Sequence, residues 1–228
     1  MAASSLQSVF HVPIFIAFFF STYYDWHYVG TRHKGPFKKL YFLTYWNACL
    51  QTLYYGLCVV KNFTSDRRRS AQLERWRDNM HACVAFPVGM FVVATFWALF
   101  AVDRELVFPK ALDHLVPFWL NHMLHTAVFP FLVIDKYLVH HQYPLRHKGI
   151  PVACALALIY LIWILFIAYY EGFWVYPILQ VLAMHQRVIF ISVCISFFAS
   201  FYILGESLTK FIWRKDIQAK ISSKSKLK

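Results

Sequence analysis

Apolar runs near the length of a membrane span dominate this 228-residue sequence, and charged residues cluster between them. About 20 consecutive apolar residues are needed to cross the hydrocarbon core of a bilayer as a helix. The runs lie at about residues 7–24, 40–60, 82–102, 115–138, 150–170 and 188–212. Only 15% of all residues are charged, whereas a soluble domain has about 25%. We therefore predict an all-α, polytopic membrane helical bundle with about six transmembrane helices rather than a very apolar soluble α-protein.

The basic residues indicate how such a bundle is oriented. The formal net charge is +12, but the Lys and Arg residues lie in loops and at the C-terminus, so we expect no nucleic-acid partner. With both termini in the cytoplasm, sixteen of these residues lie on the cytoplasmic side and seven on the other, as the positive-inside rule favours. We expect residues 1–212 to form one transmembrane domain and residues 213–228 a basic cytoplasmic tail.

Two short motifs bear on location. The sequon Asn62-Phe63-Thr64 lies in an expected cytoplasmic loop, so we predict that it is not glycosylated. The last five residues, 224–228, resemble a dilysine retrieval signal of the endoplasmic reticulum, although a basic tail that binds the membrane surface is an equal alternative. We expect an integral protein of the endoplasmic reticulum or plasma membrane, and the oligomeric state stays open. All five cysteines lie inside apolar runs, which favours no disulfide framework and no metal motif.

The fourth apolar run carries the polar residues Asn121, His122 and His125 in its first half. Ionisable groups inside a membrane span are unfavourable and are functional candidates. Spacings of three and four residues allow all three side chains to share one helical face. Packing between helices through hydrogen bonds is the alternative role for such residues.

The second run carries a matching polar stripe. Its members recur at steps of three or four residues, namely Thr44, Asn47, Gln51 and Tyr55, so they face the bundle or a cavity and not lipid. At 1.5 Å per residue, Thr44 lies about 8 Å and His125 about 15 Å from the same membrane surface. Uncertain helix ends and tilt are large enough to close this gap.

Nucleophilic acyl transfer is the chemistry that a threonine hydroxyl and an imidazole offer together. Neutral histidine is the usual base that removes the hydroxyl proton. The residues alone do not distinguish Thr44 from other threonines in the apolar runs, such as Thr52, Thr95 and Thr126. Asn47, Asn121 and His122 are possible supporting residues, and no acidic third member is evident.

The sequence resembles the androgen-induced protein / androgen-dependent TFPI-regulating protein family. The resemblance rests on YFLTYWN at 41–47, FPVGMFVVATFWALFAVDRELVFPK at 86–110, VPFWLNHMLHT at 116–126, HHQYP at 140–144, WVYP at 174–177 and YILGE at 202–206. It implies a multi-pass membrane threonine hydrolase that cleaves fatty acid esters of hydroxy fatty acids (FAHFA) and needs no cofactor. The family's nucleophile matches Thr44, and its catalytic histidine, the second in an NHxxHT motif, matches His125. Leu43 replaces the Phe or Met that precedes the family's threonine.

Two rival functions stay open at this stage. A metal-dependent lipid desaturase or hydroxylase is suggested by the histidines at positions 114, 122, 125, 140, 141 and 147, because imidazoles bind iron and zinc. Fifteen helical residues separate His125 from His140, about 23 Å, so we expect the two histidine pairs not to share a metal. We expect His140 and His141 to form an interfacial turn. The second rival is a non-enzymatic membrane scaffold, channel or transporter.

Overall fold

The computed structural model describes residues 2–30 and 38–225, and within these ranges it contains helices and loops but no strands. The α-helices in these ranges are α1 (Ala2–Tyr28), α2 (Leu43–Phe63), α3 (Arg67–Met80), α4 (Phe86–Val102), α5 (Phe118–His125), α6 (Val128–Leu138), α7 (Arg146–Tyr170), α8 (Pro177–Val181), α9 (Met184–Ile212) and α10 (Arg214–Ser225). A π-helical segment, η2 (His81–Ala85), joins α3 to α4, and short 3-10 helices are η1 (Lys38–Tyr41), η3 (Arg104–Leu106) and η4 (Lys110–Leu112). The predicted all-α class is confirmed.

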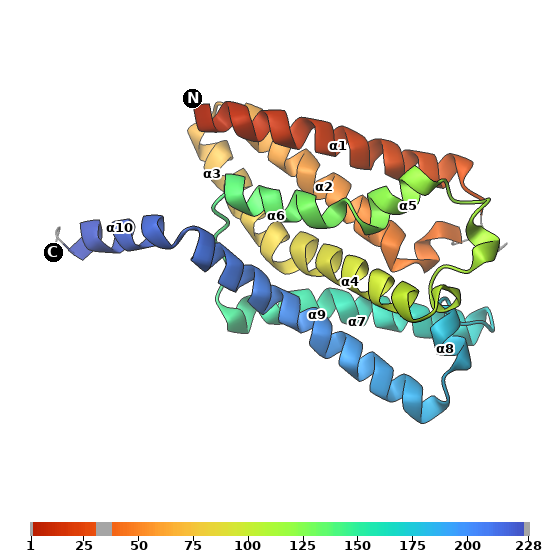
Figure 1. Ribbon diagram of the computed structural model, residues 1–228. Helices are drawn as coiled ribbons and strands as arrows, with labels where there is room; N and C mark the ends of the chain where they lie inside the picture. The colour runs from red at the N-terminus through yellow and green to blue at the C-terminus, as the bar shows by residue number, and fades with distance from the viewer. Residues whose placement is uncertain (1, 31–37, 226–228) are drawn as a thin grey trace.

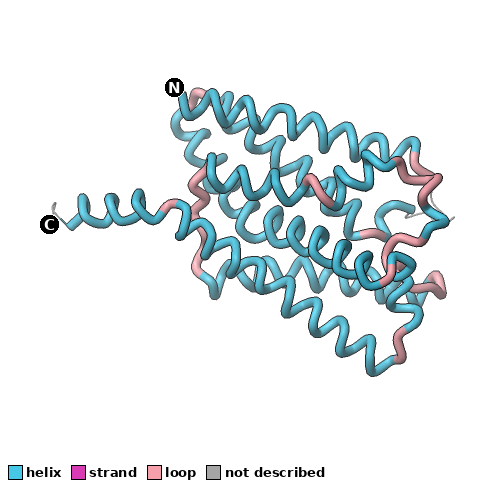
Figure 2. The backbone as a smooth tube through the Cα atoms, viewed as in Figure 1, coloured by secondary structure: helices cyan, strands magenta, loops and turns pink. Residues whose placement is uncertain are grey.

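The helices form a bundle that the chain traverses in alternating directions (Figure 1, Figure 2). Four of the described helical stretches are long and apolar enough to cross a membrane: 5–28, 67–102, 146–170 and 184–212. Helix α2, which carries the polar stripe, and the interrupted pair α5–α6 also run along the bundle. The helix α10 extends away from the bundle at the end where α1 begins (Figure 1).

The run at 115–138 was expected to be one helix, and the structure corrects this. It contains two helices separated at Thr126 and Ala127. Pro130 has no backbone N–H, so the carbonyl of Thr126 loses its normal helical partner and instead accepts from Phe129 N at 3.2 Å. The break allows α5 and α6 to differ in orientation.

The segment before the third run was expected to be a loop, but it is helical from Arg67 onward. Asp66 caps this helix, and its carboxylate accepts a hydrogen bond from the backbone N–H of Arg69 at 2.6 Å. Such N-caps stabilise a helix by about 1 kcal/mol. Hydropathy detected only the apolar part of a 36-residue helical stretch.

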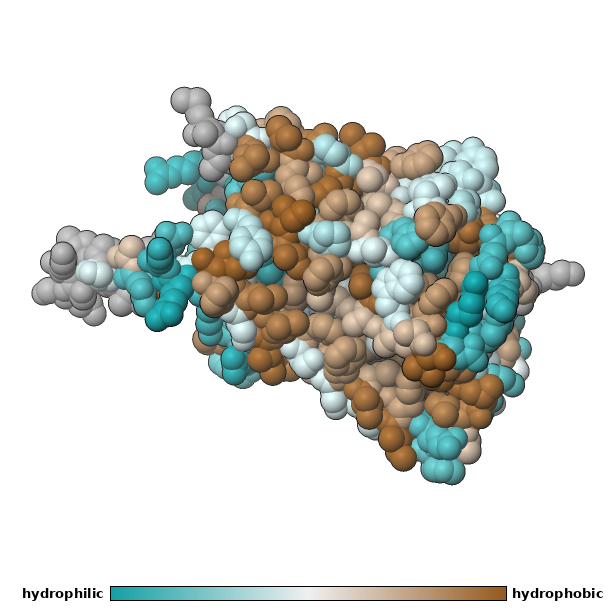
Figure 3. All heavy atoms as spheres, in the orientation of Figure 1, coloured by the Kyte–Doolittle hydropathy of each residue, from teal (hydrophilic) through white to brown (hydrophobic). Residues whose placement is uncertain are grey.

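Large hydrophobic side chains cover the sides of the bundle. Figure 3 shows hydrophobic residues over the middle of one face, with hydrophilic patches towards the ends. Exposed apolar side chains include Tyr169 at 91%, Phe118 at 80% and Phe211 at 77%. Soluble proteins rarely expose apolar patches of this extent, and the apolar helices explain them in an integral membrane protein.

Close contact between α4 and α6 depends on Gly89. A Cβ atom at this position would lie 2.6 Å from the Leu132 side chain and 2.8 Å from that of Val128. A larger residue here therefore forces these side chains to shift. The helices α1 and α2 pack along each other as well, so α2 is held between α1 and the rest of the bundle.

The Asn62 sequon lies at the end of α2, where the Asn62 amide donates to His11 Nδ1 at 2.9 Å. We expect no glycan on Asn62, because its end of the bundle is the proposed cytoplasmic one and its amide is already bound. Glycosidase treatment of the protein expressed in secretory membranes measures whether Asn62 carries a glycan. A sequon introduced into the loop after α4 serves as the positive control, and a glycan on Asn62 contradicts the orientation.

Candidate active site

Thr44 and His125 come from different helices and lie in direct contact. Thr44 is the second residue of α2, and His125 is the last residue of α5. The Thr44 Oγ1 atom is 3.1 Å from His125 Nε2. The predicted gap in depth is closed because both residues lie at the same end of the bundle, where α2 begins. Thr44 is half-buried and His125 is 7% exposed.

The tautomer of His125 follows from its other hydrogen bonds. Its Nδ1 atom lies 3.1 Å from the Asn121 backbone carbonyl and 2.9 Å from the Asn121 side-chain oxygen. A backbone carbonyl only accepts, so Nδ1 carries the proton. The Nε2 atom therefore holds a free electron pair and accepts the hydroxyl proton of Thr44. This is the arrangement that a general base requires.

Aromatic residues fix the plane of the His125 ring. Phe96 of α4 stacks on it with 3.7 Å between ring centroids and 15° between planes. The neighbouring Trp97 donates its indole N–H to the His125 carbonyl at 2.8 Å. These contacts hold the end of α5 against α4, so the imidazole has little rotational freedom.

Two tyrosines fix the start of α2, immediately before Thr44. The backbone N–H of Leu43 donates to the hydroxyls of Tyr160 at 2.9 Å and Tyr176 at 3.0 Å. Tyr160 in turn donates to the carbonyl of Tyr41 at 2.9 Å. Sequence reasoning did not single out Tyr160 or Tyr176, because they are 117 and 133 residues from Leu43. Their effect is to position Thr44.

An apolar cavity of about 150 Å³ opens beside Thr44. It lies between α2, α4, α7, α8 and α9. The lining includes Leu99 and Ile178, which lie near the end of the bundle where α2 begins. It also includes Val88 and Phe198, which lie further towards the opposite end. The lining on both sides of the hydroxyl is almost entirely apolar.

The other predicted supporting residues do not all reach this site. The His122 ring contacts the Thr126 hydroxyl at 3.0 Å and lines a second pocket that does not include Thr44. Asn47 is fully buried, and its side-chain oxygen accepts from Gln51 at 3.0 Å. Among the three supporting candidates, Asn121 is the one with a hydrogen bond to His125.

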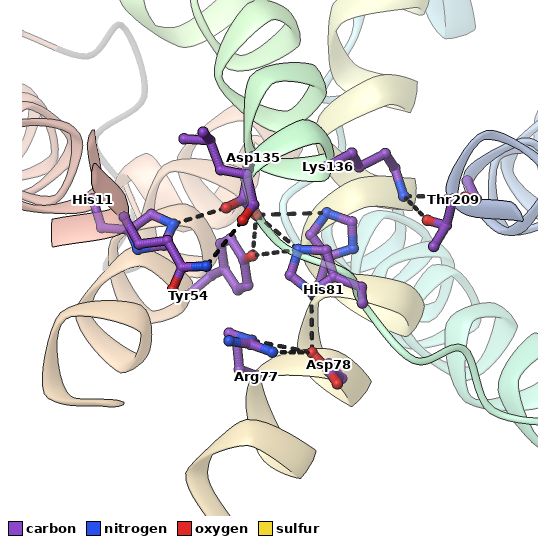
Figure 4. A network of polar contacts seen from close by, with 12 residues as sticks. His11, Tyr54, Arg77, Asp78, His81, Asp135, Lys136 and Thr209 are labelled. Carbon is purple, nitrogen blue, oxygen red and sulfur yellow. Dashed lines mark hydrogen bonds and ion pairs between the residues drawn. The ribbon is translucent and has the colours of Figure 1, made fainter. Parts of the chain in front are cut away.

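The end of α6 was expected to be an interfacial turn, and this prediction was wrong for His141. Asp135 is 0% and His141 1% exposed, and the His141 Nε2 atom lies 3.0 Å from Asp135 Oδ2 inside the bundle. His140 points elsewhere and stacks on Trp213. Figure 4 shows the polar network that surrounds Asp135, which follows His125 by ten residues in the sequence.

Comparison with known proteins identifies the family of this chain. Residues 6–210 match the FAR-17a/AIG1-like protein family. The chain belongs to this family. It is 38% identical over 182 residues to the human androgen-induced gene 1 protein, covering 75% of this chain and 76% of the relative.

Other family members are similar over comparable lengths. The human androgen-dependent TFPI-regulating protein is 35% identical over 175 residues, with 75% of this chain and 76% of the relative covered. Its counterpart from Mus musculus is 34% identical over 184 residues, which is 79% of each chain. No solved structure matches the chain. The family resemblance noted from the sequence is thereby confirmed.

Proposed function

We propose that the protein is a membrane-embedded threonine hydrolase that cleaves carboxylic esters of long-chain lipids. The observation that carries this proposal is the 3.1 Å contact between Thr44 Oγ1 and a correctly oriented His125 Nε2. The apolar cavity beside the hydroxyl supports a lipid substrate. Following the family resemblance, we propose fatty acid esters of hydroxy fatty acids as the substrate class.

The proposed reaction has two halves. His125 Nε2 takes the Thr44 proton while Oγ1 bonds to the ester carbonyl carbon, and the tetrahedral intermediate then expels the alcohol, which receives that proton from His125. An acyl ester of Thr44 remains. Water attacks this ester, His125 takes the water's proton and returns it to Oγ1, and the free fatty acid departs. Each turnover thus consumes one ester and one water and releases one acid and one hydroxy fatty acid.

The purified full-length chain in lipid nanodiscs tests the activity. We expect it to release both a fatty acid and a hydroxy fatty acid from a FAHFA substrate, measured by mass spectrometry. An inactive protein with an intact helical spectrum contradicts the hydrolase proposal and favours a scaffold or transporter.

Asn121 is proposed as a positioning residue for His125. The Asn121→Ala variant removes the 2.9 Å contact but retains the backbone carbonyl. We expect kcat to fall about 10-fold with KM nearly unchanged, because only the base is less well oriented. Asn121→Asp retains an acceptor and should recover much of kcat. An effect confined to KM, or no effect, contradicts this role.

Ala157 of α7 lines the cavity, so a larger side chain there should obstruct long substrates. We expect Ala157→Phe to reduce hydrolysis of long-chain esters by about 10-fold or more, while a butyrate ester is affected much less. Ala155 is exposed on the same helix, and Ala155→Phe is the matched control. Equal losses for long and short esters would show that the cavity does not hold the acyl chain.

We also propose that both termini are cytoplasmic and that the protein resides in the endoplasmic reticulum or plasma membrane. The basic residues at the α10 end support this orientation. The three final residues of the retrieval-like tail, 226–228, lie outside the described residues.

A further inference from the structure

A group of metal-ligating side chains lies at the opposite end of the bundle from Thr44. It consists of His81, Asp135 and His141, whose ligand atoms all lie within 4.8 Å of one another. All three residues are almost completely buried, at 0%, 0% and 1% exposure. They come from the π-helical segment η2, from α6 and from the segment that follows α6. The proposed hydrolysis uses none of them.

His81 is the residue that most requires an explanation. Neither of its ring nitrogens has a hydrogen-bond partner, although both are buried. A buried polar atom without a partner destabilises a protein by about 1–3 kcal/mol. Its Nε2 atom lies 3.9 Å from Asp135 Oδ2. His81 is the first residue of η2, and π-helical turns of this kind are frequent at functional sites.

Two members of the cluster have outer hydrogen bonds of the kind that orient metal ligands. His141 Nδ1 lies 3.1 Å from the Asp78 carboxylate, and Asp135 Oδ1 accepts from His11 Nε2 at 2.8 Å. A carboxylate that accepts the Nδ1 proton of a histidine leaves Nε2 free to bind a metal and orients the ring. The cluster therefore has three inner donors, and outer hydrogen bonds hold two of them, Asp135 and His141.

The positions of the neighbouring polar groups also suit a cation. The Tyr54 hydroxyl donates to Asp135 Oδ2 and lies 3.4 Å from His141 Nε2, so it is close enough to be a fourth donor. The Lys136 ammonium points away from the cluster and donates to the Thr209 hydroxyl at 3.1 Å (Figure 4). Its charge is thus directed towards α9 and not into the centre of the cluster.

We propose that His81, Asp135 and His141 bind a divalent transition metal ion of the zinc type, with Tyr54 in the fourth position. Ligand atoms in a tetrahedral zinc site lie about 3.3 Å apart. The present separations from Asp135 Oδ2, 3.0 Å to His141 Nε2 and 3.9 Å to His81 Nε2, bracket that value. The His81 and His141 rings stack with 3.8 Å between centroids, so binding one ion requires the His81 ring to tilt out of this stack until both Nε2 lone pairs converge. Because the donors are enclosed, the ion is structural and joins α2, η2 and α6.

The test uses the full-length protein, purified in detergent with a tag that contains no histidine. We expect about one equivalent of a transition metal per chain by plasma mass spectrometry. After removal of the metal with a strong chelator, added Zn²⁺ should raise the unfolding temperature by several degrees, whereas added Mg²⁺ should not.

Variants locate the ion. His81→Ala and His141→Ala should each lose the metal and the Zn²⁺-dependent stabilisation, while the exposed His185→Ala should retain both. Thr44→Ala should also retain the metal, which separates this proposal from the proposed hydrolysis. If the histidine variants do not fold, the metal content and the Zn²⁺ response of the wild-type protein still decide whether it binds a metal.

Two outcomes overturn the metal proposal. The first is a wild-type chain with less than about 0.1 equivalent of metal and no response of its unfolding temperature to Zn²⁺. The second is a folded double variant, His81→Ala with His141→Ala, that binds as much metal as the wild type.

Discussion

Replacing Thr44 with alanine should abolish covalent labelling by a fluorophosphonate probe and reduce ester hydrolysis by at least about 10³-fold. The variant lacks the only group at this position that can carry the acyl intermediate, while the Cβ atom and the helix remain. His125→Ala should lower labelling strongly, because the hydroxyl loses the Nε2 acceptor that lies 3.1 Å away. Gel fluorescence of labelled membranes measures both variants.

Thr126→Ala is the matched control for this result. Thr126 also contacts a histidine, His122, at 3.0 Å, but it lies away from the cavity beside Thr44. Its labelling should equal that of the wild type. Equal labelling of the wild type and Thr44→Ala, at equal protein levels, would contradict the proposed nucleophile.

The second large effect concerns stability. Asp135→Asn preserves shape but removes the buried carboxylate that faces His11 at 2.8 Å and His141 at 3.0 Å and accepts from Tyr54. Removing one partner of a buried ionic network destabilises a protein by about 3–5 kcal/mol. For a chain of this size we expect the unfolding temperature to fall by roughly 10 °C.

An exposed carboxylate provides the comparison. Asp113 pairs with Arg104 in a loop, and its side chain is 54% exposed. Surface ion pairs contribute at most about 1 kcal/mol, so Asp113→Asn should shift unfolding by no more than a few degrees. Scanning fluorimetry of both variants in the same detergent measures the difference. A stability of Asp135→Asn close to that of the wild type would show that the buried network does not hold the bundle together.

The apolar runs predicted the fold class. Helices that face lipid need apolar side chains, and these are the residues that hydropathy detects. Helix α3 was missed since its surface is charged, and its stability comes from the Asp66 cap and from continuity with α4. The break between α5 and α6 was visible in principle at Pro130, whose missing N–H interrupts the helix.

The pairing of Thr44 with His125 was predicted from family resemblance more than from spacing. Several other threonines also lie in the apolar runs, and depth estimates along straight helices leave a gap of several ångströms between Thr44 and His125. The contact depends on how α5 packs against α4, through Phe96 and Trp97. Such packing over long sequence separations is not contained in local patterns.

The buried cluster around Asp135 was missed for a related reason. His81 and His141 are 60 residues apart in the sequence, yet their rings stack with 3.8 Å between centroids. In the sequence, His140 and His141 are adjacent and look equivalent as ligands. In the structure, His140 instead stacks on Trp213. Only the three-dimensional arrangement identifies which of two adjacent histidines is inside.

Peptide mass spectrometry of the probe-labelled wild-type protein tests the central claim most directly. The proposed mechanism predicts one phosphonyl adduct, on the peptide that contains Thr44, with the modification located at the Thr44 hydroxyl. An adduct on another residue, with Thr44 unmodified, would contradict the account.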